Sequence, residues 1–143
     1  MTIDLMCTKE TITTRVLVIG SIKASGVKRR QRIRISGLWL YDFGFAEDTL
    51  VICEFGMGKA AFKAAGRGIE TYSKYISDIR QNGGHITQVK NTVHNKKRTP
   101  HFEVSGFWLA RYGFNTGDVI ALYCRPGLIE VIRLDVSKAR GFH

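Results

Sequence analysis

The sequence predicts a mainly β fold that is duplicated within one chain of 143 residues. Three observations lead to this expectation. A thirteen-residue motif occurs twice, and both copies are flanked by stretches rich in β-branched and aromatic residues with Gly-containing turns. Only one segment, which lies between the copies, has the apolar spacing of a helix.

The repeat is the strongest signal in the chain. Residues 33–45 read IRISGLWLYDFGF and residues 102–114 read FEVSGFWLARYGF, so six of thirteen positions are identical at an offset of 69. Both tryptophans of the protein, Trp39 and Trp108, fall in register. We therefore expect two units with the same local structure.

Each unit is predicted to begin with a strand, at 15–23 (RVLVIGSIK) and at 85–93 (HITQVKNTV). A basic loop and the motif strand follow, and the motif strand ends at Ser-Gly before a short turn around Trp-Leu. A hairpin closes each unit, with GMG and RPG as the two turns. GMGK at 56–59 lacks the long Gly-rich spacing of a phosphate-binding loop.

The segment 68–84 separates the units and predicts one α-helix over about 69–82. Four apolar residues have helical spacing there, and Gly83-Gly84 supplies a stop. We expect the apolar stripe to pack on the body of the protein. The stripe consists of Ile69, Tyr72, Ile76 and Ile79. The expected organisation is one domain, 1–143, containing a first repeat at 15–66, a helical linker at 67–84 and a second repeat at 85–136.

The repeated residues have predictable structural roles. The glycine after each motif strand fits a positive φ or a close approach of the backbone, and the later glycine fits a left-handed stop after one helical turn. The tryptophans are expected to anchor the core, because they can bury the largest area. The glycines in question are Gly37 and Gly106, then Gly44 and Gly113.

The motif Ser-Gly-x-Trp-Leu-x-x-x-Gly-Phe followed by a hairpin resembles the SymE-type toxin family, which is itself similar to the AbrB/MazE group of regulators and antitoxins (the SpoVT-AbrB swapped-hairpin class). The resemblance covers Ile33 to about Ala64 and Phe102 to about Asp135. It implies a pseudo-twofold swapped-hairpin barrel, which two tandem repeats of one chain would build internally. One departure is Glu47-Asp48, where the second repeat has the more family-like Thr116-Gly117-Asp118.

Two basic clusters stand at corresponding places of the repeats. Five of the eight residues 28–35 are cationic, and alternation along the strand predicts that Ile33 and Ile35 point inward while Arg32 and Arg34 point outward. If the halves pair, we expect the two basic loops to lie side by side as one nucleic-acid-binding surface. The predicted binding residues are Lys28, Arg29, Arg30, Arg32, Arg34, Lys96, Lys97 and Arg98.

The net charge of +10, from 22 Lys and Arg against 12 Asp and Glu, favours a polyanionic partner. DNA or RNA is the expected partner, bound through its phosphate backbone; an anionic membrane or an acidic protein is the alternative. The sequence contains no apolar run of membrane-spanning length and no apolar signal-peptide core at its N-terminus, so we expect a cytoplasmic protein. Three cysteines without CxxC spacing, Cys7, Cys53 and Cys124, predict no metal site, and no cofactor is expected. Cys53 and Cys124 are expected to be buried hydrophobic residues.

Three functions are consistent with these observations. The first is a non-catalytic DNA-binding protein of the SymE/AbrB kind, acting in transcriptional regulation, nucleoid binding or a toxin–antitoxin pair, as a monomer with an internal pseudo-dimer or as a homodimer. The second is an RNA-cleaving toxin, for which His94, His101 and Glu103 are the candidate acid–base groups. The third is an inhibitor from a phage or mobile element, similar in role to an anti-CRISPR protein, which binds a protein partner.

Overall fold

The computed structural model describes residues 13–23, 29–68, 70, 72–74, 76–77 and 85–134, and antiparallel β-strands make up most of these described residues. This confirms the mainly β prediction. The first repeat contributes β1 (Thr13–Val18), β2 (Gly20–Lys23), β3 (Arg29–Ser36), β4 (Thr49–Gly56) and β5 (Lys59–Arg67). The second contributes β6 (His85–Gln88), β7 (Lys90–His94), β8 (Lys97–Ser105), β9 (Val119–Arg125) and β10 (Leu128–Leu134).

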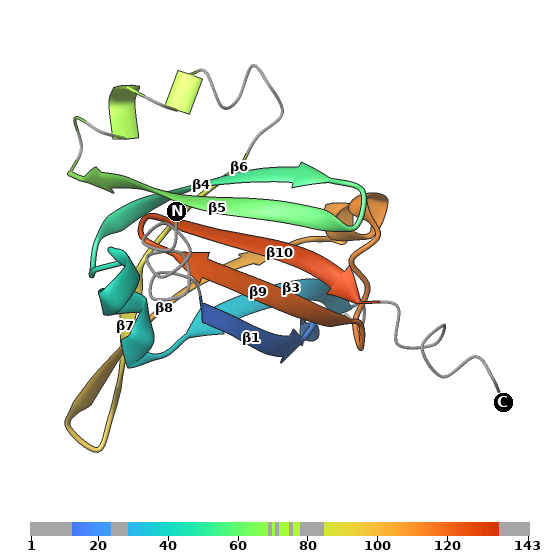
Figure 1. Cartoon of the computed structure of the whole chain (residues 1–143), viewed down its shortest axis with the longest axis horizontal. Coiled ribbons are helices and arrows are strands. Elements are labelled where there is room, and N and C mark those ends of the chain that lie inside the picture. Colours follow the sequence, from blue (N-terminus) through green and yellow to red (C-terminus); the bar gives the residue numbers. More distant parts are fainter. Residues whose placement is uncertain are drawn as a thin grey trace, which may run out of the picture.

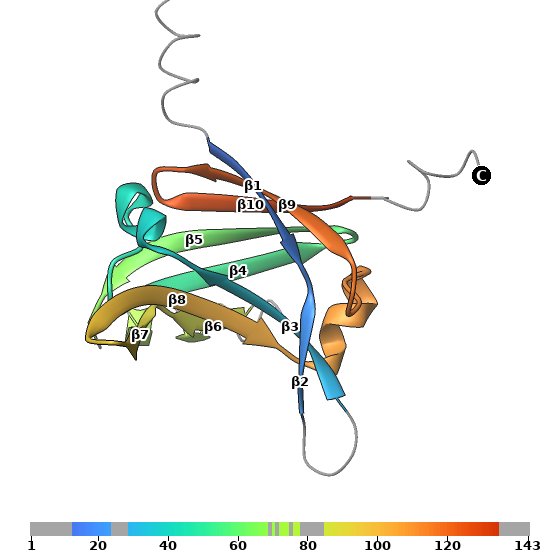
Figure 2. The same ribbon diagram turned by 90° about the horizontal axis from the view of Figure 1, so that it is seen from below.

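The strands form two sheets. One has six strands in the order β1-β9-β10-β5-β4-β6, and the other has four in the order β2-β3-β8-β7. Figure 2 shows the sheets as two layers, with β5 and β10 above β3 and β8. The sheets do not close into a barrel, so that part of the prediction is wrong.

Each sheet combines strands of both repeats. β1 of the first repeat pairs with β9 of the second, and β6 of the second pairs with β4 of the first. The hairpins β4–β5 and β9–β10 meet through β5 and β10, and the motif strands β3 and β8 pair with each other. Each repeat therefore completes its hairpin with a strand from the other repeat (Figure 1).

The strands predicted at 15–23 and 85–93 are each divided by one buried residue, Ile19 or Val89. The amide of Ile19 donates to the carbonyl of Asp118 at 2.8 Å, and the amide of Val89 donates to the carbonyl of Thr49 at 2.9 Å. The first bond goes to the loop before β9 and the second to the first residue of β4. At Ile19 and Val89 the chain leaves the six-stranded sheet and enters the four-stranded one. The two sheets are consequently separate ladders, which explains why no continuous barrel forms.

Helical structure is short. The Trp-Leu turns are 3-10 helices, η1 (Leu38–Phe43) and η2 (Phe107–Tyr112), of six residues each. They are therefore longer than the single turn that was expected, since a 3-10 helix has about three residues per turn. Glu70, residues 72–74 and residues 76–77 are helical within the predicted linker helix. The remainder of that prediction, including Ile69 and Ile79, lies outside the described residues.

The core lies between the two sheets. Its largest fully buried side chains are phenylalanines from both repeats: Phe45, Phe62, Phe102 and Phe114. The rings of Phe45 and Phe102 stack with their centroids 5.6 Å apart. The tryptophans are only half-buried, so the phenylalanines, rather than Trp39 and Trp108, fill the centre.

The glycines behave as predicted at the ends of the motif strands. Gly37 has φ 142° and Gly106 has φ 153°, and a Cβ at either position would collide with the indole two residues later. Gly44 and Gly113 are left-handed at the ends of η1 and η2. The indole of Trp39 donates to the carbonyl of Ser36 at 3.1 Å, which holds the ring against the glycine. Each Ser-Gly-x-Trp element is thus a turn closed by its own tryptophan.

We expect Gly37→Ala to lower the free energy of unfolding by about 2 to 4 kcal/mol, because strain at positive φ adds to overpacking against Trp39. Gly20→Ala is the matched control, since a Cβ there meets nothing within 4 Å. Its effect should stay within about 0.5 kcal/mol. Urea denaturation of both variants measures the difference, and equal stability would contradict the proposed role of Gly37.

Candidate nucleic-acid interface

The outer face of the four-stranded sheet is basic. Ile33 and Ile35 on β3 and Phe102 and Val104 on β8 are buried, so the side chains between them face away from the core. The strand register extends this face onto β7. We call this surface the basic face; its charged and titratable residues are Arg30, Arg32, Arg34, Lys90, His94, Lys97, His101 and Glu103.

Most cations of the basic face are not neutralised. Glu103 is its only acid, and it pairs with Arg34 at 3.3 Å. Within the described part of the chain, the other four cations form no ion pair with an acid. These four are Arg30, Arg32, Lys90 and Lys97.

The outer face of the six-stranded sheet differs in this respect. Lys63 pairs with Glu54 at 2.9 Å, and Arg125 pairs with Glu130. Positive charge on that face is therefore partly compensated within the protein, whereas the basic face retains most of its charge.

The structure places the predicted residues in three groups. Arg30, Arg32, Arg34 and Lys97 lie on the basic face, and the outward direction of Arg32 and Arg34 is confirmed. Arg29, the first residue of β3, and Arg98, the second residue of β8, are directed away from the basic face by the alternation along their strands. The Nε of Arg29 donates to the Ser21 hydroxyl at 2.8 Å, and Arg98 pairs with Glu47 at 2.9 Å.

The two remaining predicted binding residues are Lys96 and Lys28. Lys96 lies in the turn between β7 and β8, with φ 65° beside Asn95 at φ 51°. Two-residue turns of this kind favour glycine at the second position, so a lysine there is held in a less favourable conformation. Lys28 lies outside the described residues.

The two basic loops do not come together, contrary to the prediction. Arg34 pairs with Glu103 across β3 and β8, and the strands run in opposite directions from this pair. Arg29 lies five residues before Arg34, and Arg98 lies five residues before Glu103. At about 3.3 Å per residue the loops are roughly 30 Å apart, at opposite ends of the sheet. The side chains of the basic face lie between the two loops.

A short polar network lies at the middle of the face. Besides its pair with Glu103, Arg34 donates to the Thr92 hydroxyl at 3.0 Å. That hydroxyl lies 2.9 Å from Nδ1 of His101. Because Thr92 accepts from Arg34, its proton is free to be donated to Nδ1, an assignment that leaves the neutral ring's proton on Nε2.

Burial lowers the pKa of His101, and the positive charges of Arg34 and Lys90 lower it further, against the attraction of Glu103. His85 is stacked on Trp108, with ring centroids 3.6 Å apart, and burial lowers its pKa also. Both imidazoles are therefore favoured in the neutral form at neutral pH.

The candidate acid–base residues are not gathered into one site. His94 lies opposite Lys97, and His101 lies opposite Lys90. Lys90 and His94 both belong to β7, and their spacing along this strand puts the two histidines about 13 Å apart. Glu103 is engaged by Arg34. Within the described ranges, no group of three His, Cys, Asp or Glu side chains is placed to hold a metal ion.

Sequence reasoning missed Lys90 and Thr92. Their alternation with His94 marks one face of a strand, but only the register with β8 shows that this face continues the one on β3. Cys53 and Cys124 are buried as predicted, and burial raises the pKa of their thiols to about 12 and about 11. Cys7 lies outside the described residues.

Comparison with known proteins found no matching family model, no matching curated protein and no matching solved structure. None of the helices formed by the described residues has the length and apolar character to cross a membrane.

We expect Arg34→Gln to raise the pKa of His101, because a repelling charge is removed while Glu103 remains. The pKa of His85 should stay unchanged and serves as an internal control, since its shift arises from burial alone. Titration of the imidazole signals by NMR measures both values. An unchanged His101 pKa would show that the network does not couple these side chains.

Proposed function

We propose that the protein binds nucleic acid, and duplex DNA in the first place, through the basic face. The observation that carries this proposal is a single sheet surface with four uncompensated cations and one acid that is already paired. Packing like charges this closely is unfavourable, and a row of phosphates relieves the repulsion. The strained Lys96 at one end of the same sheet supports a role beyond folding.

Duplex DNA is favoured over single strands because no Phe, Tyr or Trp of β3, β7 or β8 points outward in the described sheet. Proteins that bind single strands use such aromatic side chains to stack on bases. The motif strands are eight and nine residues long, so the face spans about 25 to 30 Å. That length matches roughly seven to eight base pairs of a duplex bound mainly by its backbone.

The assignment of the fold to the SymE/AbrB kind is also part of this proposal. The exchange of β1 and β6 between the repeats supports a pseudo-twofold swapped-hairpin arrangement of the SymE/AbrB kind. A regulator, a nucleoid protein or a component of a toxin–antitoxin pair would each use such a surface. The protein is proposed to act by binding and not by catalysis.

We expect the double variant Arg30→Gln/Arg32→Gln to bind duplex DNA at least about ten-fold more weakly at moderate salt, because two phosphate contacts are lost. The slope of log K against log salt should become shallower by about 2. Electrophoretic or fluorescence titration at several salt concentrations measures both quantities, with single-stranded DNA and RNA as parallel ligands.

The matched control is Lys59→Gln/Lys63→Gln, which removes the same charge from the outer face of the six-stranded sheet. Its affinity and slope should remain close to those of the unaltered protein. Equal losses in both variants would show that net charge alone drives binding. Tighter binding to a single strand would contradict the choice of duplex.

We expect binding to strengthen as the pH falls below about 6.5, the ordinary value for histidine. A nearby phosphate favours the protonated imidazole, and the bound state therefore takes up a proton at His101, whose pKa in the free protein is lowered. His101→Asn should reduce this pH dependence, whereas His85→Asn should leave it unchanged. Titrations at pH 5.5 and 7.5 measure the effect; identical pH dependence in both variants would place His101 away from the bound phosphates.

A further inference from the structure

A cavity of about 790 Å³ lies where the chain passes from β6 to β7. Sites for small ligands usually have volumes of about 300 to 1,000 Å³, so the cavity is large enough to hold one. Its walls come from the ends of β4 and β5, from β6 and from Tyr72, which follows β5. Lys90 of β7 also lines it, and Lys90 belongs to the basic face. The cavity therefore adjoins the proposed nucleic-acid interface.

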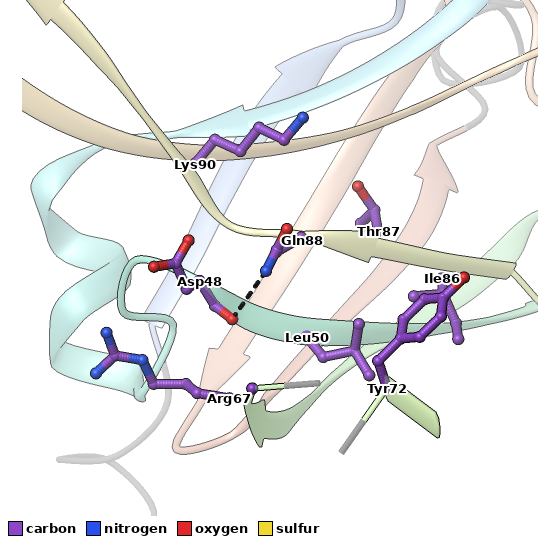
Figure 3. A pocket seen from close by; sticks show the side chains of 9 residues that line it. Asp48, Leu50, Arg67, Tyr72, Ile86, Thr87, Gln88 and Lys90 are labelled. Atoms are coloured by element: carbon purple, nitrogen blue, oxygen red, sulfur yellow. Dashed lines mark hydrogen bonds between the residues drawn. The ribbon is translucent and has the colours of Figure 1, made fainter. Parts of the chain in front are cut away.

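One side of the cavity is apolar and carries an aromatic ring. Leu50 points outward from β4, outside the core between the sheets, and is nevertheless only 5% exposed. The register of β4 and β6 places Ile86 on the same outer face. Figure 3 shows the Tyr72 ring beside Leu50 and Ile86. A ring beside aliphatic side chains favours a flat aromatic ligand that stacks on it.

The other side of the cavity is polar. Figure 3 shows Asp48 and Arg67 away from the Tyr72 ring, with Gln88 between them and the ring. Nε2 of Gln88 donates to the backbone carbonyl of Asp48 at 3.3 Å, which leaves the amide oxygen of Gln88 as an acceptor. Arg67 and Lys90 add positive charge to the lining. The cavity thus combines hydrogen-bond acceptors with cations that suit a phosphate.

The fold does not require these polar groups. The hairpin β9–β10 pairs with β1 as β4–β5 pairs with β6, and the backbone bonds of Val89 to Asp48 and Thr49 have counterparts there. At this equivalent place, however, glycine and valine replace the polar residues of the cavity. The counterparts of Asp48, Gln88 and Lys90 are Gly117, Val18 and Gly20.

Asp48 is held in an unfavourable conformation. Its φ is 69°, in the left-handed region, and Gly117 has φ 91° at the equivalent position. Glycine adopts positive φ at no steric cost, and aspartate tolerates it less well. Strain of this kind is found most often at functional sites. The chain therefore retains a carboxylate at the cavity where a glycine would satisfy the fold.

We propose that the cavity binds one guanine nucleotide unit. A carboxylate only accepts hydrogen bonds, and its two oxygens match two adjacent donors. Guanine is the base that has two such donors, N1–H and N2–H₂, side by side on its pairing edge. In the complex the base stacks on Tyr72, its pairing edge donates to Asp48, and Lys90 attracts the phosphate.

The guanine unit has two possible sources with the same chemistry. It is either a free nucleotide or an unpaired nucleotide of a nucleic acid bound on the basic face, because Lys90 belongs to both sites. Only the second source rests on the proposed function. The two sources are separated by the experiment.

The first arm titrates the full chain with guanosine or adenosine monophosphate and follows the Tyr72 ring and the Leu50 and Ile86 methyl groups by NMR. If the source is a free nucleotide, guanosine monophosphate should bind at least about ten-fold more tightly, because adenine offers Asp48 only one donor. Asp48→Asn should shift the preference toward adenine, since an amide offers one donor and one acceptor. Asp48→Gly should abolish the preference and retain the fold.

The second arm compares a blunt duplex with duplexes that carry one unpaired guanine or one unpaired adenine at an end. If the source is a bound nucleic acid, the unpaired guanine should strengthen binding at least about ten-fold more than the adenine does. A guanine preference in either arm that Asp48→Asn reverses supports the proposal and identifies the source. No guanine preference in either arm, or a preference that survives both changes of Asp48, overturns it.

Two comparisons separate the cavity from general effects. Tyr72→Ala should weaken binding of the preferred ligand about five-fold or more through lost stacking. Tyr41→Ala is the control, because Tyr41 on η1 is 43% exposed and Tyr72 is 40% exposed; equal losses would contradict stacking on Tyr72. Arg30→Gln/Arg32→Gln should weaken blunt-duplex binding and leave free-nucleotide binding unchanged, whereas Asp48→Gly should leave blunt-duplex binding unchanged. Failure of the cavity proposal is thus distinguishable from failure of the basic face.

Discussion

Exchange of strands between the repeats is the constraint on which the rest of the structure depends. β4–β5 needs β6 of the other repeat to extend its sheet, and β9–β10 needs β1. A two-stranded hairpin alone is marginally stable in water, so neither repeat has a complete sheet by itself. The core phenylalanines come from both repeats for the same reason, and Phe62 packs edge-on against Phe102. Folding of one half therefore requires the other.

The same exchange fixes the register at the centre of the four-stranded sheet. Because equivalent strands pair antiparallel, position 34 faces its own counterpart, position 103. Two identical repeats would place like charges opposite each other there. The chain instead has Arg34 and Glu103, and the pair, being about one third exposed, contributes at most about 1 kcal/mol. Its greater effect is to distinguish the two halves, since pairing of two first repeats would bring two arginines together.

The sequence difference between the two repeats also distributes charge unevenly along the basic face. β3 presents Arg30 and Arg32, whereas β8 has Thr99 and His101 at the corresponding positions. The permanent charge is thus greater on the first repeat, and part of the second repeat's contribution depends on pH through His101. A ligand bound across the centre meets unequal halves although the backbone is nearly symmetric. The opposite surface, on the six-stranded sheet, instead combines paired charges with an apolar region.

The sequence by itself determined the repeat, the hairpins, the Ser-Gly-x-Trp turns and the inward direction of Ile33 and Ile35, because each depends on residues close together in the chain. The positive φ of Gly37 is set by contact with Trp39, two residues away. Only the tertiary structure decided that the strands break at Ile19 and Val89, that the sheets stay separate, and that Lys90 joins the basic face. It also decided that the Arg29 and Arg98 loops lie at opposite ends. These features follow from pairing between strands, many of them far apart in the chain, such as β1 with β9 and β3 with β8. The register of such a pair is set by packing of the whole core rather than by local sequence.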